Sequence, residues 1–502
     1  MRRLAGALLF LALAAPSYRS YDDYLRELGP SRFALPVRSV EGREIPAVAV
    51  GGGPGAPVQL VFGLTHGREW PSGEVALLYA RELATSRDPR LVALRRRLRT
   101  IVVPVVNPDG LVRTQSGQPL WRRNARGVDL NRNFGAFWGG PGASTLPASD
   151  TYRGPGPWSE PETQAVHALS AGLAVTSVVS LHNVGALVLR PPGFRALGVA
   201  PDEAGLRRLG DAMAVAAGYR SAYAADLYEA TGALEDWSYL AQGAYGFTIE
   251  LGENDGDNSF TGHYDTHVTQ QYQGSARVGG GALPHGGVRE ALLLAAEEAQ
   301  DPRDHALVVG RAPAGHVLRL RKSFVTMTSP VCVDDPCSAT TPAMGLADAL
   351  AITLTVPASG RFAWHVGPST RPFVARGGGR EAWTLECLDG GAVAAAHQVV
   401  VGRGERASVD PCVAGSAVRV ARNPAARVLR VVGVRRSGGR VRARLVCARS
   451  CTVHATLRGR SARAVLLPST ARTISLPAAR GRLTVRAVDS VGERAKTTRF
   501  LR

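Results

Sequence analysis

Short apolar runs alternate with segments of helical periodicity along the first 300 residues. Strands are expected at 58–64, 100–106, 175–182 and 246–251. Helices are expected at 72–84, 159–171, 203–217 and 287–299, the second opening with a capping box at Ser159 and Glu162. The runs at 100–106 and 175–182 are continuously apolar, which is typical of strands buried on both faces. This alternation predicts an α/β domain with helices on both faces of a mixed sheet, which we place at 20–302.

After about residue 303 the hydrophobic period changes to two. Apolar and Thr positions alternate through 352–356, and Phe362, Trp364 and Val366 repeat the pattern. Such alternation predicts strands with one buried face. We expect two all-β sandwich-like modules, at 305–412 and 413–502.

The second module carries a turn signal and a row of arginines. Gly438-Gly439 fits a two-residue hairpin turn, and Arg440, Arg442 and Arg444 fall on one face of the strand that follows. The chain has a net charge of +19, and residues 413–502 hold 21 basic side chains against two acidic ones. A codon preference for Arg explains the scarcity of Lys but not the local scarcity of acids. The module is therefore interpreted as a possible contact for an anionic cell-surface polymer; specific nucleic-acid binding is not expected.

The N-terminus predicts export. Arg2 and Arg3 precede an apolar run that ends in a small-x-small pattern, so residues 1–15 are expected to be a signal peptide of a secreted, extracellular or cell-wall-associated protein. The run is too short to span a bilayer, and no transmembrane segment is expected. Six cysteines, all beyond residue 330, predict three disulfides. Six cysteines allow fifteen disulfide connectivities, and we expect pairing in sequence order. Zinc binding by the cysteines is the alternative, but the sequence has no CxxC motif to support it.

The stretch GLTHGREWPSGEVA sets His66 three residues before Glu69, between a strand and a helix. It is either a polar turn or two-thirds of a metal site. A catalytic zinc needs three protein ligands and one open position. The third ligand is expected at a neighbouring strand end, where His182 closes the run VTSVVSLH.

Six motifs occur in one order along the chain. They are H-x-R-E-W, N-P-D-G, W-R, D-x-N-R-N, the His after an apolar strand, and Y…D-W-S-Y…F-T-x-E-L. Together they resemble the zinc metallocarboxypeptidases of the carboxypeptidase A/B (funnelin) type over residues 20–302. The resemblance implies a carboxypeptidase-like sheet and one Zn²⁺ ion. It also implies hydrolysis of the C-terminal peptide bond of a substrate.

The resemblance also implies a role for each matching residue. Zn²⁺ would be bound by His66, Glu69 and His182, with Asp129 holding His66 by its other ring nitrogen. Glu250 would be the general base, and Arg122 would stabilise the oxyanion.

Further matching residues would bind the substrate. Asn131 and Arg132 would hold the terminal carboxylate, Tyr228 would close over it, and Arg68 would contact residues further up the peptide. Glu235 has two interpretations. Either it lines the specificity pocket and favours basic C-terminal residues, or it points to solvent beside a helix N-terminus.

Three departures from the family pattern are visible. The domain begins near 18–24 without room for a long prodomain, Val184 replaces a substrate-contacting Tyr, and 252–260 is an acidic loop, interpreted as solvated. The sequence predicts a secreted zinc-dependent exopeptidase acting on the C-termini of peptides or proteins. The alternatives are a peptidoglycan stem-peptide amidase, a zinc deacylase of N-acyl amino acids, and a catalytically inactive surface-binding protein.

Overall fold

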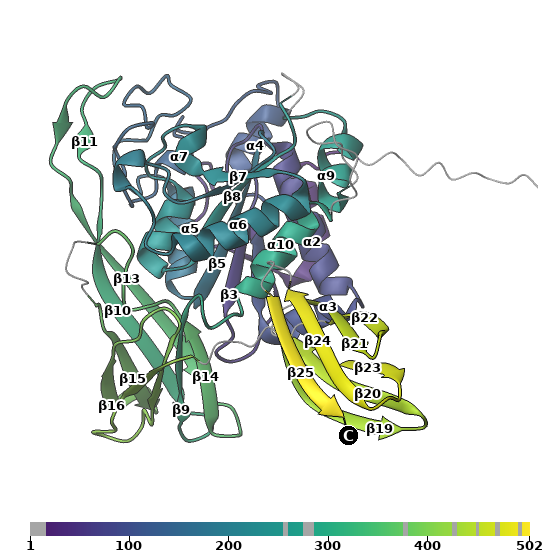
Figure 1. The fold of residues 1–502 in the computed structure, drawn as a ribbon. Helices are drawn as coiled ribbons and strands as arrows, with labels where there is room; N and C mark the ends of the chain where they lie inside the picture. The colour runs from purple at the N-terminus through teal and green to yellow at the C-terminus, as the bar shows by residue number, and fades with distance from the viewer. Residues whose placement is uncertain are drawn as a thin grey trace, which may run out of the picture.

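The first part of the chain folds around an eight-stranded mixed sheet with the order β1-β2-β4-β3-β5-β8-β6-β7 (Figure 1). The computed structural model describes residues 17–254, 260–274, 286–374, 380–423, 429–447, 451–466, 472–489 and 494–501. The strands of this sheet are β1 (Arg32–Ala34), β2 (Pro46–Gly51), β3 (Val58–Phe62), β4 (Arg99–Val103), β5 (Val175–Asn183), β6 (Leu187–Arg190), β7 (Arg220–Tyr223) and β8 (Tyr245–Leu251). The mixed α/β domain predicted from the alternation is confirmed.

Helices cover both faces of the sheet, as predicted. They are α1 (Tyr21–Leu28), α2 (Trp70–Thr85), α3 (Pro89–Arg97), α4 (Pro108–Gln115), α5 (Pro161–Ala171), α6 (Glu203–Ala217), α7 (Ala224–Leu227), α8 (Leu234–Trp237), α9 (Gln270–Gln273) and α10 (Gly287–Glu298). One face packs against α1, α2, α3, α6 and α10, and the other packs against α5 and α8. Val61 points to the first face, whereas Leu60 and Phe62 point to the second, because side chains alternate along a strand.

The four central strands β4, β3, β5 and β8 run parallel to one another. β3, β5 and β8 are buried along their whole length, which explains their continuous apolar character. Because their carboxyl ends meet at one edge of the sheet, residues that follow them are brought together there. This edge carries the site described below.

Two facing four-stranded sheets follow, with the orders β13-β10-β15-β16 and β14-β9-β17-β18. Their strands are β9 (Ala306–Arg311), β10 (Val317–Met327), β13 (Gly345–Thr355), β14 (Arg361–Val366), β15 (Trp383–Asp389), β16 (Ala392–Val399), β17 (Glu405–Val409) and β18 (Arg419–Arg422). The alternation predicted for 352–356 is confirmed, since Ile352 and Leu354 are buried while Thr353 and Thr355 are exposed. Two further short strands, β11 (Val331–Cys332) and β12 (Thr340–Thr341), extend the β10–β13 hairpin.

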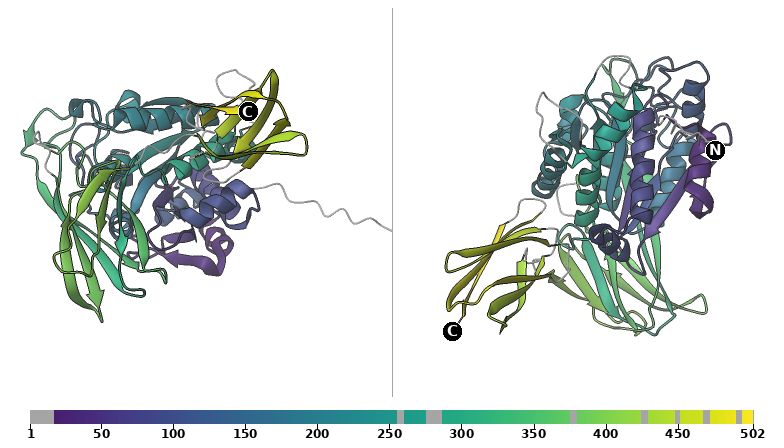
Figure 2. Two further views of the ribbon diagram at one scale, coloured as in Figure 1. Left: turned by 60° about the horizontal axis from the view of Figure 1, so that its bottom comes forward. Right: turned by 90° about the vertical axis from the view of Figure 1, so that its right-hand side faces the viewer.

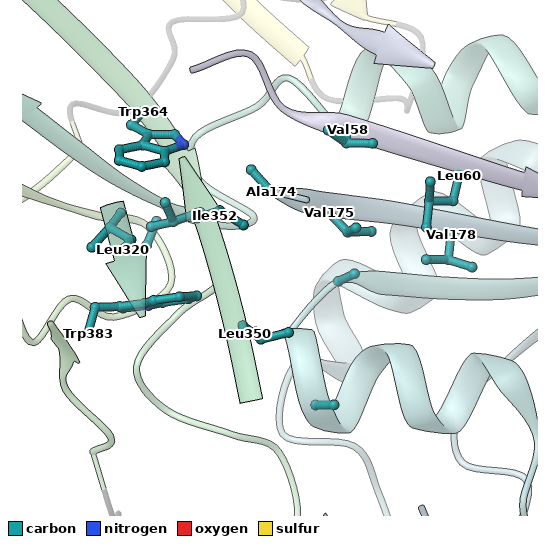
Figure 3. Packing of buried hydrophobic residues seen from close by; sticks show 14 of the residues in the cluster. Val58, Leu60, Ala174, Val175, Val178, Leu320, Leu350, Ile352, Trp364 and Trp383 are labelled. Atoms are coloured by element: carbon teal, nitrogen blue, oxygen red, sulfur yellow. The ribbon is translucent and has the colours of Figure 1, made fainter. Parts of the chain in front are cut away.

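The first sandwich shares a hydrophobic core with the α/β domain. Figure 3 shows Ile352, Trp364 and Trp383 of the sandwich gathered beside Val58 and Val175 at the starts of β3 and β5. All five side chains belong to one buried cluster. The sandwich is thus packed onto the domain rather than tethered to it by a linker.

The last two sheets, β19-β20-β23 and β22-β21-β24-β25, enclose a separate core (Figure 2). Their strands are β19 (Leu429–Ser437), β20 (Arg440–Cys447), β21 (Cys451–Leu457), β22 (Arg460–Leu466), β23 (Arg472–Pro477), β24 (Gly481–Asp489) and β25 (Arg494–Leu501). The predicted hairpin turn is confirmed, because Gly438 and Gly439 connect β19 to β20 with φ of 58° and 70°, which glycine adopts without strain. The disulfides join neighbours in sequence, as expected: Cys332–Cys337, Cys387–Cys412 and Cys447–Cys451.

Three details of the predicted organisation differ from the structure. β18 lies beyond the predicted boundary at residue 412 but pairs with β17, so the first sandwich continues through Arg422. The run at 100–106 is strand only to Val103. The capping box is wrong: Glu160 occupies the N-cap, and Glu162 instead accepts hydrogen bonds from Val40 N and Asn124 Nδ2.

The predicted signal peptide lies outside the described residues, and the other domain boundaries stay predictions. Among the helices that the structure describes, none is both long and apolar enough to cross a bilayer.

Candidate metal centre and substrate cavity

Three buried side chains converge at the carboxyl edge of the central sheet. His66 lies four residues beyond the end of β3, Glu69 occupies the N-cap position of α2, and His182 is the penultimate residue of β5. The three are 2%, 1% and 2% exposed, and their ligand atoms all lie within 4.8 Å of one another. The turn after β3 therefore brings the two residues of the H-x-R-E-W motif to the third predicted ligand.

The hydrogen bonds around the imidazoles orient one nitrogen of each ring into this cluster. Nε2 of His66 lies 3.0 Å from Oδ1 of Asp129, and Nε2 of His182 lies 2.9 Å from Ser180 Oγ. The two Nδ1 atoms face each other at 3.1 Å and lie 2.7 and 3.0 Å from the carboxylate oxygens of Glu69. Because Asp129 accepts the proton of Nε2, the Nδ1 of His66 presents a lone pair. Two imidazole nitrogens and a carboxylate form a donor set that suits zinc.

Charge pairing explains why so many polar groups are buried here. Burial alone would raise the pKa of Glu69, but the two imidazoles hold that pKa well below its ordinary value. Burial likewise opposes ionisation of Asp129, yet Arg122, His66 and Arg132 hold its pKa well below the usual range. Burial lowers the pKa of His182, and the carboxylate of Glu69 outweighs that effect and raises it.

Glu250 lies on β8, directly opposite His182 in the parallel pairing of β5 with β8. Its side chain is 7% exposed. Burial raises the pKa of Glu250 to about 7; the neighbouring His182 lowers it and the carboxylate of Glu69 raises it. A carboxyl group of this kind can accept a proton near neutral pH and release it again.

Arginines line the cavity next to the cluster. Nε and Nη2 of Arg122 donate to Asp129 Oδ2 at 3.0 and 2.9 Å, and Nη1 lies 3.7 Å from Glu69 Oε1. Arg132 donates to the carbonyl of Gly142 at 2.7 Å and stacks on the half-exposed ring of Tyr228. Arg122, Arg132 and Tyr228 all line a cavity of about 740 Å³. The cavity therefore has a cationic wall beside the candidate ligands.

The remaining predicted substrate residues lie around this wall. Asn131 is buried, and its side-chain oxygen accepts a hydrogen bond from Leu234 N at 3.0 Å. Arg68 lines the cavity and pairs with Asp150 at 3.1 Å. The structure thus brings both residues to the site, although Arg68 is already engaged by a neighbouring carboxylate.

Glu235 does not point to solvent. It lies on α8, is 4% exposed, and its Oε2 has no hydrogen-bond partner among the residues that the structure describes. Its charge acts on both His182 and Glu250, so it lies near the cluster. The adjacent Asp236 is also buried; burial raises the pKa of Asp236 well above its usual range, and Glu235 adds to the rise. The solvent-facing interpretation of Glu235 is therefore wrong.

Some residues of the site were missed by sequence reasoning. Ser180 could have been found, since it lies two positions before His182 and shares its face of the strand. The cavity wall at 334–337 could not, because those residues follow the α/β domain by many positions and carry no motif of the site. The part of loop 252–260 between 255 and 259 lies outside the described residues.

Comparison with known proteins relates this chain to zinc carboxypeptidases. The family model described as "Zinc carboxypeptidase" matches residues 20–266. A Metallocarboxypeptidase A-like protein of Trichophyton verrucosum is 30% identical over 250 residues, which are 44% of this chain and 59% of that protein. Carboxypeptidase A2 of Mus musculus is 33% identical over 207 residues, 37% of this chain and 49% of that protein. The solved carboxypeptidase A from Helicoverpa armigera superposes with a TM-score of 0.46 at 27% identity, covering 56% of this chain and 74% of that chain.

The chain thus spans about half the length of the curated relatives it matches. The matched region ends at residue 266, before the first sandwich begins at β9.

Proposed function

Because residues 20–266 form a zinc carboxypeptidase domain, we propose that this chain removes C-terminal residues from peptides or proteins in a zinc-dependent reaction. The observation that carries the proposal is the convergence of His66, Glu69 and His182 beside Glu250 at one sheet edge. Burying four polar side chains together costs free energy of folding unless they bind a ligand or pair with one another. Here the ligand atoms of His66, Glu69 and His182 all lie within 4.8 Å of one another.

The three side chains would hold a single zinc ion through His66 Nδ1, His182 Nδ1 and the Glu69 carboxylate. Zinc supplies Lewis acidity, which polarises a carbonyl oxygen and acidifies a water molecule. Asp129 and Ser180 hydrogen-bond to the Nε2 atoms of His66 and His182, so the Nδ1 atoms need not reorient when zinc binds.

Glu250 would act as the general base. It would take a proton from the attacking water and pass it to the nitrogen of the departing residue, whose C–N bond breaks. Arg122 would stabilise the negative charge that develops on the former carbonyl oxygen, since its guanidinium is already fixed by Asp129.

The terminal carboxylate would bind at Arg132 and Asn131. Arg132 lies in the wall of the cavity, held by the Gly142 carbonyl, and a guanidinium matches a carboxylate in shape and charge. Tyr228, half exposed beside Arg132, would cover the bound end. Arg68 would meet residues further up the peptide. Such a site accepts the end of a chain rather than its middle.

Glu235 supports a preference for basic C-terminal residues. A buried carboxylate with one unpartnered oxygen, beside a second buried acid, leaves negative charge uncompensated. A Lys or Arg side chain, or the amino-bearing side chain of diaminopimelate, would compensate it. An aromatic side chain would not.

The primary test compares peptides with free and amidated C-termini on the zinc-loaded protein. Release of the last residue should need the free carboxylate, because Arg132 binds it, and should stop when zinc is removed and return when zinc is restored. Equal cleavage of both forms would favour an endopeptidase or amidase, and no cleavage by a zinc-loaded protein would overturn the proposal.

We further propose export of the protein and contact with an anionic surface polymer. The three disulfides fit an oxidising compartment. Arg440, Arg442 and Arg444 are exposed on β20, and Arg435 lies directly across from Arg442. Like charges face each other across the strands, and a polyanion would relieve their repulsion. Retention on an immobilised acidic polymer should fall with salt and with Ala at the three β20 positions.

A further inference from the structure

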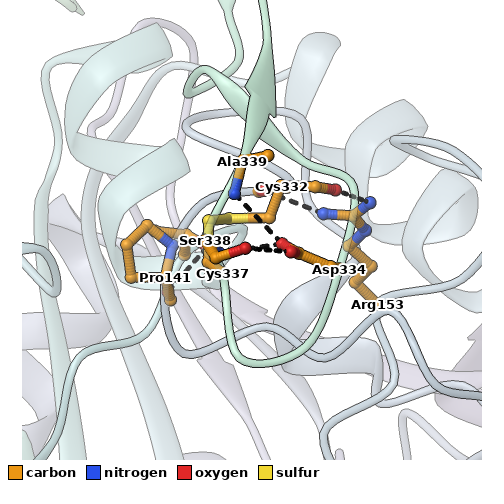
Figure 4. The surroundings of a disulfide bond; sticks show 9 residues. Pro141, Arg153, Cys332, Asp334, Cys337, Ser338 and Ala339 are labelled. Atoms are coloured by element: carbon orange, nitrogen blue, oxygen red, sulfur yellow. Dashed lines mark hydrogen bonds between the residues drawn. A yellow bond between two sulfur atoms is a disulfide. The ribbon is translucent and has the colours of Figure 1, made fainter.

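A hairpin of the first sandwich reaches the substrate cavity of the α/β domain. β10 and β13 pair along eleven positions, β11 and β12 continue the hairpin, and the Cys332–Cys337 disulfide closes its tip (Figure 4). In Figure 1 the hairpin rises along the side of the domain, and its tip stands near the loops around α7. We call residues 332–337 the hairpin tip.

Backbone contacts fix the hairpin on the segment 137–144 of the α/β domain. Phe137 N donates to the Met327 carbonyl at 3.0 Å, and Cys332 N donates to the Gly139 carbonyl at 2.8 Å. The buried Arg153 donates to the carbonyls of both Gly139 and Cys332, at 2.8 and 2.7 Å. Figure 4 shows Arg153 beside the disulfide, donating to the Cys332 carbonyl. The tip is therefore held in one place by the domain it contacts.

The same segment also holds the residue assigned to the substrate carboxylate. Arg132 donates to the Gly142 carbonyl, and two residues further on Ser144 Oγ is hydrogen-bonded to Asp335 of the tip. The 740 Å³ cavity is accordingly lined both by Arg122, Arg132 and Tyr228 and by residues 334–337. The hairpin tip is a wall of the same cavity.

The cavity is lined by arginines and by acids, and the tip supplies Asp334 and Asp335 beside Asp150 and Glu229. The carboxylate of Asp334 accepts hydrogen bonds from Ser338 and from Ala339 N, and that of Asp335 accepts one from Ser144. These donors are neutral, so they leave the negative charge of the tip in place. The charge of Asp335 also acts on the guanidinium of Arg153 and raises its pKa against the effect of burial. Asp335 is exposed, so its carboxylate is open to a partner from solvent.

We propose that the hairpin tip contacts the substrate peptide upstream of its C-terminal residue, and that Asp335 selects a cationic side chain there. The inference rests on the proposed function, which places the terminal carboxylate at Arg132. Because an exopeptidase takes only the end of a chain, the preceding residues extend away from Arg132 through the cavity that Arg68 and the tip also line. Each extended residue covers about 3.3–3.6 Å, so the first few residues before the scissile bond come within reach of the tip. The sandwich thereby becomes part of the substrate-binding site.

The test uses the full chain, zinc-loaded, and hexapeptides with a free C-terminus. A single Arg or Leu is placed in turn at the second, third, fourth and fifth position from that end. Binding is followed by fluorescence anisotropy with a labelled N-terminus, and hydrolysis is measured separately as kcat/KM. At one upstream position, Arg should bind about 5-fold more tightly than Leu, as expected for an exposed ion pair, and the preference should shrink at high salt.

Asp335→Asn keeps an acceptor for Ser144 but removes the charge, so it should abolish this preference and leave Leu peptides unchanged. Asp335→Arg should reverse it in favour of Glu. Asp389→Asn, at the far end of β15 in the same sandwich, is the matched control. An equal affinity for Arg and Leu at every upstream position overturns the inference, as does a preference that survives Asp335→Asn or one confined to the C-terminal residue.

The binding measurement needs no turnover. A wild-type protein that shows the Asp335-dependent preference but cleaves no peptide would contradict the proposed function and still support a peptide contact at the tip.

Discussion

Nε2 of His66 lies 3.0 Å from Oδ1 of Asp129, and this contact determines which nitrogen of the ring faces the candidate metal ligands. Asp129 is fully buried and also accepts two hydrogen bonds from Arg122. One carboxylate thus orients a candidate zinc ligand and a guanidinium that lines the cavity at once. The metal cluster and the cationic wall of the cavity are therefore coupled through a single side chain.

Asp129→Asn should weaken zinc binding by about 10- to 100-fold, because the amide accepts a hydrogen bond more weakly and no longer balances Arg122. Competition with a chromophoric chelator measures the affinity, and circular dichroism checks the fold. Ser180→Ala, which loosens the other ring, should have a smaller effect. Unchanged zinc affinity in a folded Asp129→Asn protein would show that this contact does not prepare the ligand.

Glu250→Gln should lower kcat by about 100- to 10,000-fold while zinc affinity stays within a few-fold of wild type. Gln matches Glu in shape but cannot take the proton. Steady-state hydrolysis of a free-acid peptide provides the measurement. Glu405→Gln, in β17 of the first sandwich, is the control and should be neutral. Wild-type turnover by a zinc-loaded Glu250→Gln protein would show that Glu250 is not the general base.

Glu235→Gln should reduce kcat/KM for peptides ending in Arg or Lys by about 30-fold, the result of losing a buried charge pair worth roughly 2 kcal/mol. Peptides ending in Phe or Leu should change little. Glu235→Asp keeps the charge and should preserve most of the preference. If the ratio of basic to apolar ends is the same in all three proteins, Glu235 does not set specificity.

The pair formed by the buried His305 and the half-buried His365 should make the protein less stable in acid. Their Nε2 and Nδ1 atoms lie 2.5 Å apart, and the backbone N of His365 donates to Gly55 of the α/β domain. Burial lowers the pKa of His305 to about 3, with Asp301 opposing and Arg403 adding to the shift, and burial together with His305 also lowers the pKa of His365.

In the unfolded chain these residues bind protons near pH 6.5, whereas folded His305 has a pKa of about 3 and folded His365 a pKa well below 6.5. The unfolded state therefore holds more protons between those values. The contribution of the histidines to the free energy of unfolding is fully present above pH 6.5. It falls as the pH drops, by up to about 1.4 kcal/mol per pH unit for each histidine. Denaturant melts from pH 7.5 to 4 should show a shallower decline for the His305→Gln/His365→Gln double variant. Parallel declines in both proteins would contradict this account.

The sequence by itself determined the pieces of the fold and their chemistry. Continuous apolar runs predicted the buried strands β3, β5 and β8, and a period of 3.6 residues predicted the helix α6, because burial on two faces or on one face imposes those patterns. The motif order pointed to the zinc carboxypeptidase family, and the even number of cysteines predicted three disulfides. These are local or compositional properties of the chain, and they can be predicted without knowing which residues pack against each segment.

Only the tertiary structure decided what each polar group meets. Glu162 satisfies the capping-box pattern yet binds Val40 and Asn124 instead, because those distant groups compete for its carboxylate. Glu235 fits a solvated helix start as well as a pocket, and packing rather than sequence buries it. The hairpin tip lies more than 180 residues from Gly142 and Ser144 along the chain, and pairing of β10 with β13 carries it to their cavity. Contacts between segments so far apart leave no periodic trace in either one, so the place of the hairpin tip in this cavity was decided only by the tertiary structure.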